Sequence, residues 1–182
     1  MKEVPYIRYQ NNLSFKNKFY RLIWNLFYKL LFKPFCGPFL SNYRVFVLRL
    51  FGAKIGNGCK IKSSVNIWSP NNLIVGNYVA IGDNVILYNP EKITIGNRVT
   101  ISQFSHLCSA SHDITKIHNP LVTGEIVIHD LVWIATDVFV GLGVNIEEGC
   151  VVGARSSVFK DLKSWRVYGG SPAKEIKHRK IS

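Results

Sequence analysis

The stretch VWIATDVFVGLGVNIEEGCVVGARSSVFKD, residues 132–161, carries an aliphatic residue at every sixth position. These positions are Ile134, Val140, Ile146, Val152 and Val158. A period of six differs from the 3.6 residues of a helical turn and from the two-residue alternation of a flat sheet. It is typical of a parallel β-helix that is built from hexapeptides.

The same period begins at residue 55, and every interruption of it falls after a third hexad. Two additional residues lie between positions 67 and 75, two between 87 and 95, and fifteen between 107 and 128. Three hexads therefore form one triangular coil of eighteen residues, and every insertion leaves the coil at the same corner. We predict an all-β main body, a parallel β-helix of about five triangular coils. The aliphatic side chain at the first position of each hexad would stack inside it. The other first positions are Ile55, Ile61, Ile67, Val75, Ile81, Leu87, Ile95, Ile101, Leu107 and Ile128.

The formal net charge of +12 lies at the two ends of the 182-residue chain. Residues 1–54 carry a net charge of +9, residues 55–162 carry −2 and residues 163–182 carry +5. These ranges are also the predicted organisation: an N-terminal helical and basic segment, the β-helix and a basic tail. No known nucleic-acid-binding motif accompanies the basic ends, so we expect no nucleic-acid partner. Such ends instead favour cofactor phosphates or a membrane surface.

The N-terminal segment has two candidate helices, over residues 15–33 and 43–51. The first is apolar except for a narrow polar stripe, and it is too short and too interrupted by charge to cross a membrane. Two roles remain open: a cap over the open end of the β-helix with contacts between subunits, or an anchor at a membrane interface. The stripe consists of Lys18, Arg21, Asn25 and Lys29.

The tail and the cysteines complete the outline. Ser171 and Pro172 predict a short C-terminal helix, with the serine as its cap and the proline in its first turn. The four cysteines have no paired spacing, which fits a reducing compartment. Residues 1–12 lack the apolar run of a secretory signal, so we expect none. We therefore expect a cytoplasmic protein, with the inner face of the membrane as a further option.

The fifteen-residue insertion DITKIHNPLVTGEIV, residues 113–127, follows His112 directly. Long loops on a rigid scaffold are usually binding or catalytic elements. A solvated insertion without a role is the alternative. The insertion makes this corner the candidate functional site.

The hexads, the SHD sequence at residues 111–113 and YGGSPAKEI at residues 168–176 resemble the hexapeptide-repeat O-acetyltransferases. The resemblance is closest to the colanic-acid-biosynthesis group, which is related to the maltose, galactoside and nodulation acetyltransferases. LIWNLFYKLLFKPF at residues 22–35 also resembles that group. The resemblance implies a left-handed β-helix, a homotrimer and acetyl-CoA as the co-substrate in clefts between subunits.

His112 matches the catalytic histidine of this family. A hydroxyl is a poor nucleophile, and a neutral imidazole is well matched to removing its proton near neutral pH. We expect direct transfer without an acyl-enzyme, and we interpret Cys108, four residues away, as a packing residue. The imidazole would be oriented by Asp113 or by a backbone carbonyl group.

Two asparagines are candidates for binding the acceptor. Asn89 matches an asparagine of this group, one coil earlier than His112, and its amide would hold the acceptor hydroxyl. A turn role for Asn89 remains open, since asparagine favours the position before a proline. Asn84 is a weaker candidate for the same task.

Small residues predict a groove for coenzyme A. Ala135 and Gly153 are eighteen residues apart, as are Thr136 and Ala154, so each pair stacks one coil apart. Pantetheine could lie along this track against backbone amides. The resemblance implies coenzyme A contacts at Thr136, Ala154, Phe159, Lys160, Lys174 and Lys177, although the family usually has Thr or Val in place of Phe159. A solvated basic tail is the alternative for the last two lysines.

The sequence thus predicts an O-acetyltransferase that modifies a sugar hydroxyl in surface polysaccharide biosynthesis, either exopolysaccharide or O-antigen. The acceptor would be a sugar or a lipid-linked glycan. Alternatives are a non-catalytic assembly or membrane-docking protein, and an acyltransferase acting on an amine or a serine. No metal is expected, because His106 and His112 would lie roughly 20 Å apart along one extended side.

Overall fold

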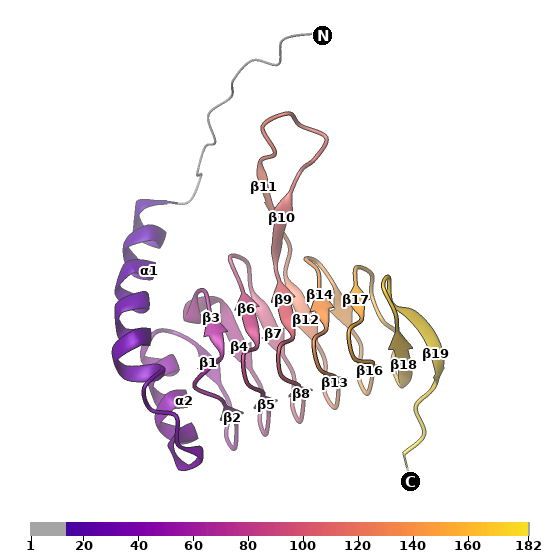
Figure 1. Cartoon of the computed structure of the whole chain (residues 1–182), viewed down its shortest axis with the longest axis horizontal. Coiled ribbons are helices and arrows are strands. Elements are labelled where there is room, and N and C mark those ends of the chain that lie inside the picture. The colour runs from indigo at the N-terminus through magenta and orange to yellow at the C-terminus, as the bar shows by residue number, and fades with distance from the viewer. Residues whose placement is uncertain (1–13, 182) are drawn as a thin grey trace.

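The computed structural model describes residues 14–181. Its body is a parallel β-helix with three faces, and two helices stand at the N-terminal end of that body (Figure 1). The predicted β-helix is confirmed, and every insertion does leave from one corner. The body contains five complete coils and the beginning of a sixth, which Leu162 starts by bridging to Ile146.

Each face is one sheet of short strands, which are parallel except for β19 at the edge of the second face. The first face contains β1 (Lys54–Ile55), β4 (Leu73–Val75), β7 (Ile93–Ile95), β12 (Ile126–Ile128) and β15 (Asn145–Ile146). The second contains β2 (Lys60–Ile61), β5 (Ala80–Ile81), β8 (Thr100–Ile101), β13 (Trp133–Ile134), β16 (Val151–Val152), β18 (Arg166–Gly169) and β19 (Lys174–His178). The third contains β3 (Asn66–Ile67), β6 (Ile86–Tyr88), β9 (His106–Cys108), β14 (Phe139–Val140) and β17 (Ser157–Val158).

Three corners connect the faces. The first corner, between the first and second faces, comprises residues 56–59, 76–79, 96–99, 129–132, 147–150 and 163–165. The second corner, between the second and third faces, comprises residues 62–65, 82–85, 102–105, 135–138 and 153–156. The third corner returns to the first face through residues 68–72, 89–92, 109–125, 141–144 and 159–161, and it includes a 3₁₀ turn, η3 (Pro70–Asn72).

The hexad pattern explains both the core and the corners. First-position side chains such as Leu87, Leu107 and Val140 are fully buried inside the prism. The chain turns at a corner by placing one residue in the left-handed region, for example Tyr78 with φ of 58°. At the equivalent place in the fifth coil Gly149 has φ of 70°, and a Cβ there would lie 2.6 Å from the Trp165 ring. That corner therefore requires glycine.

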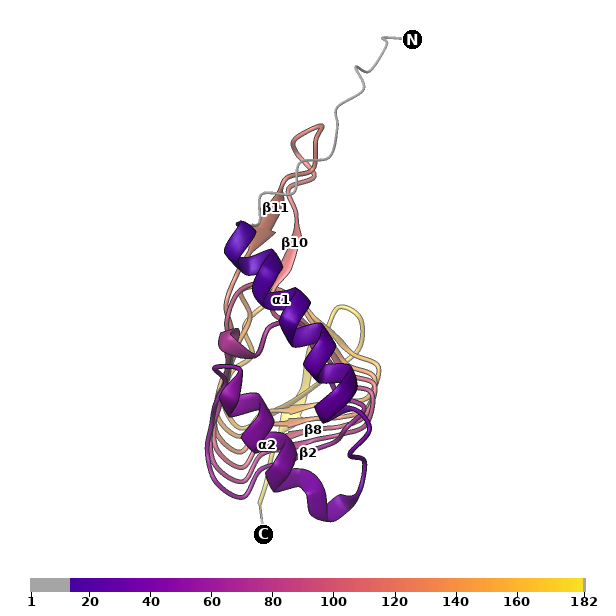
Figure 2. The same ribbon diagram turned by 90° about the vertical axis from the view of Figure 1, so that its left-hand side faces the viewer.

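The N-terminal segment caps the open end of the β-helix, as one of the two predicted roles requires. It contains α1 (Phe15–Phe27), a π-helical turn η1 (Tyr28–Phe32), a 3₁₀ turn η2 (Pro38–Leu40) and α2 (Ser41–Leu50). Both helices lie in front of the end of the prism in Figure 2. Trp24 is fully buried and donates its indole N–H to the carbonyl of Ile67 at 2.7 Å. The buried guanidinium of Arg44 donates to the carbonyl of Ile61 at 2.7 Å.

The predicted C-terminal helix is wrong. β18 continues the second face, with Val167 opposite Val151, and β19 returns antiparallel to β18. The last full coil offers a row of unpaired backbone groups, and strands that satisfy this row displace a marginal helix of a few residues. Ser171 and Pro172 lie in the turn between the two strands, and the β-helix extends beyond residue 162.

Replacing Trp24 tests the cap. Trp24→Ala leaves a cavity under α1 and should lower the free energy of unfolding by about 3–5 kcal/mol. Trp24→Phe keeps an aromatic ring but leaves the Ile67 carbonyl without its donor, so it should cost about 1–3 kcal/mol. Urea unfolding measures both. Phe19→Ala, on the exposed side of α1, is the matched control and should change stability by less than about 0.5 kcal/mol. Equal stability of Trp24→Ala and the control would contradict the cap.

Candidate active site

The insertion at the third corner forms a β-hairpin rather than an irregular loop. β10 (Ala110–His112) pairs antiparallel with β11 (Leu121–Thr123), and the hairpin projects from the body (Figure 1). The amide of Gly124 donates to the carbonyl of Ser109 at 3.0 Å and closes the base. His112 therefore lies three residues beyond the base, and the predicted segment 113–127 includes the hairpin tip, β11 and the start of β12.

The hairpin holds the His112 ring by one nitrogen. His112 pairs with Leu121 across the hairpin, and its Nδ1 lies 2.6 Å from the backbone carbonyl oxygen of Asn119. A carbonyl oxygen only accepts, so Nδ1 carries the hydrogen and the neutral ring has its lone pair on Nε2. The side chain is exposed, and Nε2 has no hydrogen bond to any residue from 14 to 181. His112 is thus oriented with a basic nitrogen available to an outside group.

Asp113 does not orient His112 in this structure. Its carboxylate accepts hydrogen bonds from the amide and the hydroxyl of Thr115, and it lies 3.5 Å from the ammonium of Lys116. The Thr115 hydroxyl, the Thr115 amide and then Lys116 hold the pKa of Asp113 below its ordinary value. Asp113 therefore fixes the turn at the hairpin tip, and a backbone carbonyl takes the orienting role that the sequence left open.

The structure shows Asn89 buried at the third corner and Asn84 exposed at the second. Asn89 is fully buried; its side-chain oxygen accepts from the amide of Ser69 at 3.0 Å and its side-chain nitrogen donates to the Ser69 carbonyl at 2.7 Å. Both ends of this amide are used to hold adjacent coils together at the third corner. This geometry corresponds to the turn role that the sequence left open, and the acceptor-binding role stays a prediction. Asn84 is exposed at the second corner with φ of 57°, a conformation that asparagine tolerates.

The small-residue track is present at the second corner. Ile134 pairs with Val152, and the amide of Ala135 donates to the Val152 carbonyl at 2.9 Å, so Ala135 stacks above Gly153 as predicted. Thr136 and Ala154 stack in the same way. The Thr136 hydroxyl donates to the carbonyl of Gln103 at 3.0 Å, which ties this corner to the coil before it.

The other predicted coenzyme A contacts separate into two places. Phe159, Lys160 and Lys174 line one cavity of about 300 Å³ at the third corner, together with Leu162, Tyr168 and Pro172. Lys177 does not line this cavity; it borders a hollow with Val167 and Arg179 further along β19. The register of the two strands separates the lysines, because Lys174 lies opposite Gly169 at the start of β19 and Lys177 lies opposite Val167 three residues further along.

Sequence reasoning missed an aromatic row on the third face. The His106 ring meets the Phe139 ring edge-on at 5.6 Å between centroids, and Phe139 lies 5.6 Å from Phe159. Burial lowers the pKa of His106, and its Nε2 is buried without a partner among the described residues. The hexad register carried the signal. His106 directly precedes Leu107 and Phe139 directly precedes Val140, which are first positions of hexads on the third face, and His106 and Phe139 pair across neighbouring coils.

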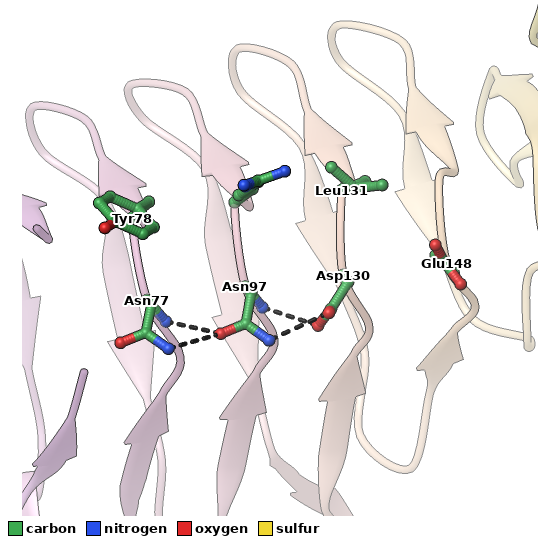
Figure 3. Close-up of a pocket in the computed structure, with 7 residues that line it drawn as sticks. Asn77, Tyr78, Asn97, Asp130, Leu131 and Glu148 are labelled. Carbon is green, nitrogen blue, oxygen red and sulfur yellow. Dashed lines mark hydrogen bonds between the residues drawn. The ribbon is translucent and has the colours of Figure 1, made fainter. Parts of the chain in front are cut away.

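A second missed feature is a polar ladder at the first corner. Figure 3 shows Asn77, Asn97 and Asp130 in a row. The backbone N–H of Asn77 donates to Asn97 Oδ1 at 2.9 Å, and the side-chain nitrogen of Asn97 donates to the Asp130 carboxylate at 3.0 Å. They border a shallow hollow of about 340 Å³ with Arg98 and Glu148. Their polar atoms bond to one another and to the turning backbone, so we interpret the ladder as a corner clamp. Within residues 14–181, no three His, Cys, Asp or Glu side chains gather as a metal site would require.

Comparison with known proteins decides the family. A protein of Escherichia coli K12 named "Putative colanic acid biosynthesis acetyltransferase WcaF" is 50% identical to the chain over 140 residues, which are 77% of each protein. The chain belongs to the WcaF family of acetyltransferases. This membership confirms the resemblance and the enzyme class that the sequence indicated. The chain matches no protein-family model.

Solved structures agree with the WcaF-family fold. A hexapeptide-repeat-containing acetyltransferase of Vibrio cholerae, solved with acetyl coenzyme A, gives a TM-score of 0.85 at 23% identity, over 94% of this chain and 93% of that one. A maltose O-acetyltransferase from Clostridium difficile gives 0.78 at 22% identity, over 92% and 90%. At such identities the likeness shows the fold alone.

The Asp113 turn generates a prediction about pH. Because the folded pKa of Asp113 is depressed, its bonds to Thr115 stabilise the hairpin tip above the ordinary pKa and are lost as the pH falls through the folded value. Thr115→Val removes one donor and should raise the Asp113 pKa toward its ordinary value. An NMR titration of the residue 115 amide would measure the midpoint. Thr123→Val, on β11 of the same hairpin, should leave that midpoint unchanged; an unchanged midpoint in Thr115→Val would contradict the assigned turn.

Proposed function

We propose that this WcaF-family protein transfers an acetyl group from acetyl-CoA to a hydroxyl group of a sugar, with His112 as the general base. One observation carries the proposal: the Asn119 carbonyl at Nδ1 leaves the basic lone pair of the exposed imidazole on Nε2. A general base needs this tautomer and a fixed ring. Membership of a family named for colanic acid biosynthesis supports a sugar acceptor, and a structural neighbour solved with acetyl coenzyme A supports the donor.

The reaction follows from the position of this proton acceptor. Nε2 of His112 takes the proton of the acceptor hydroxyl as its oxygen forms a bond to the thioester carbonyl carbon. The carbon–sulfur bond then breaks, and the imidazolium returns the proton to the departing thiolate. No enzyme nucleophile is needed, because a thiolate is already a competent leaving group. Cys108 donates its thiol hydrogen to the Ala110 carbonyl at 3.1 Å and keeps a packing role.

Acetyl-CoA would contact both the cavity at the third corner and the small-residue track at the second corner. The cavity of Phe159, Lys160 and Lys174 combines an exposed aromatic ring with two ammonium groups, which suits part of a nucleotide with its phosphates. The track of Ala135, Thr136, Gly153 and Ala154 offers a narrow path for the pantetheine arm. Lys177 is outside this cavity, so we assign it no direct part.

A homotrimer would complete the site. The small-residue track lies at the second corner, whereas His112 and the cavity lie at the third corner. One face of the prism, roughly 15–20 Å of chain, separates these corners in a single subunit. A neighbouring copy that brings its second corner against this third corner would place track and histidine in one cleft. The acceptor would be a sugar unit, either free or carried on a lipid.

The first test removes the base. His112→Ala should lower kcat by roughly 10²–10⁴-fold, the usual contribution of a general base, with little change in acetyl-CoA affinity. Thiol release with a panel of sugar acceptors measures turnover, and calorimetry measures donor binding. His118→Ala, an exposed histidine of the same hairpin, is the matched control and should keep full turnover. A folded His112→Ala protein with normal turnover would exclude the mechanism.

The second test separates the lysines. Lys160→Ala and Lys174→Ala should each raise the Michaelis constant for acetyl-CoA roughly tenfold, since a charge-assisted bond to phosphate is lost. Neither should affect acetyl-pantetheine, which lacks the nucleotide. Lys177→Ala is the matched control on the same strand and should change neither constant by more than about twofold. Similar losses for all three variants, or for both donors, would contradict the cavity as the phosphate site.

A further inference from the structure

Helix α1 has a second apolar face that nothing in the described chain covers. Its inner face, centred on Trp24, packs against the end of the β-helix. Five large side chains on the opposite face are between 55 and 82% exposed. Their spacing of three and four residues places them in one row along the helix and its π-helical extension. This outer apolar row consists of Phe15, Phe19, Leu22, Leu26 and Leu30.

The exposed apolar surface continues onto the neighbouring elements. Phe39 in η2 is 96% exposed, and Phe46 and Leu50 of α2 are 56 and 67% exposed. α1 and α2 lie at the same end of the molecule in both views and face the viewer together in Figure 2. Within residues 14–181 these side chains stay uncovered, because the end of the prism is already occupied by the inner face of the cap.

The charge around this surface has one sign. From residue 14 to residue 82 the chain has ten Lys and Arg and no Asp or Glu. Lys16, Lys18 and Lys29 are exposed beside the outer apolar row. Arg21 belongs to the same sequence stripe but faces inward, with its guanidinium 3.7 Å above the Trp68 ring. The surface is therefore an apolar strip flanked by lysines, with Arg21 excluded from it.

These features favour one kind of occupant. A second copy of the same surface would bring lysines against lysines, which repel. The row is on a convex helix rather than in a groove, and an apolar helix face flanked by lysines suits the headgroup region of an anionic bilayer. Among residues 14–181, no helix has both the length and the apolarity to cross a bilayer. The helix would therefore lie in the plane of the membrane.

We propose that the outer faces of α1, η2 and α2 form a peripheral docking surface for anionic lipid, with Phe15, Phe19, Leu22, Leu26 and Leu30 inserted among the headgroups and Lys16, Lys18 and Lys29 at lipid phosphates. The surface is independent of His112 and of acetyl transfer. Docking places the β-helix end-on to the membrane, with the basic cap between lipid and coils.

Vesicle flotation tests the surface with the full-length protein. We expect binding to vesicles of phosphatidylcholine and phosphatidylglycerol at low salt, little binding to phosphatidylcholine alone, and release at high salt because salt screens the lysine contribution. Lys16→Gln, Lys18→Gln and Lys29→Gln combined should lower partitioning on the order of 100-fold, about fivefold for each lysine near the surface. Exchange of Lys92, Arg98 and Lys180 for glutamine is the matched control and should bind as the unaltered protein does.

The apolar row is tested by a pair of variants. Leu22→Gln with Leu26→Gln should lower partitioning by at least roughly tenfold, since the inserted apolar area is lost. Ile176→Gln with Ile181→Gln removes two exposed side chains near the opposite end of the chain and should have no effect. Melting temperature and sedimentation velocity check that every variant keeps its fold and its oligomeric state.

Two outcomes overturn the proposal. The first is absence of binding to anionic vesicles at low salt. The second is a change of oligomeric state in Leu22→Gln with Leu26→Gln while vesicle binding stays normal, which would assign the row to contacts between copies. Either outcome leaves the acetyl-transfer proposal intact, because that proposal is tested by thiol release in solution.

Discussion

Each coil of this protein completes the backbone hydrogen bonds of the coil beside it. The amide of Gly56 donates to the carbonyl of Val75 at 2.8 Å, and four coils later the amide of Gly153 donates to the carbonyl of Tyr168 at 2.8 Å. Strands of two or three residues cannot hold together by themselves, so the stack must be continuous. Both ends of the stack then expose backbone groups that need partners. The helices α1 and α2 meet this need at one end, and β18 with β19 meets it at the other.

The same constraint determines where chemistry can be located. The faces are regular and their inward side chains are aliphatic, so a polar side chain with freedom to act must leave the stack. It can do so at a corner without interrupting the hydrogen bonds between coils. The hairpin of β10 and β11 uses this freedom, and it carries His112 clear of the prism with its own backbone supplying the partner for Nδ1. Rigid coils below the hairpin fix its base through Ser109 and Gly124.

The geometry of the prism also places the parts of the candidate site at different corners. Corners of one subunit are separated by the width of a face, so the small-residue track and the histidine hairpin cannot meet within one chain. The inner faces of the N-terminal helices pack against the open first coil, and their outer faces stay exposed. In both places the β-helix leaves surfaces that the described chain does not cover, and the residues on those surfaces differ in kind. Small residues and backbone line the track, whereas leucine, phenylalanine and lysine cover the cap.

Much of this architecture follows from the sequence by itself. Hexad periodicity and the position of each insertion predict the coils, their core and the corner from which the hairpin leaves, because these depend on local repetition that side chains record directly. The amphipathic N-terminal helices and His112 as the candidate base are likewise visible in short stretches of residues. Other features were decided by tertiary structure alone. The Asn119 carbonyl reaches His112 only because the hairpin pairs, and a backbone carbonyl leaves no mark in the sequence. Asn89 turns inward because Ser69 of the previous coil offers it both a donor and an acceptor. The tail forms strands instead of a helix because the edge of the second face supplies hydrogen bonds that a short segment cannot find locally, and that strand geometry in turn separates Lys177 from Lys174.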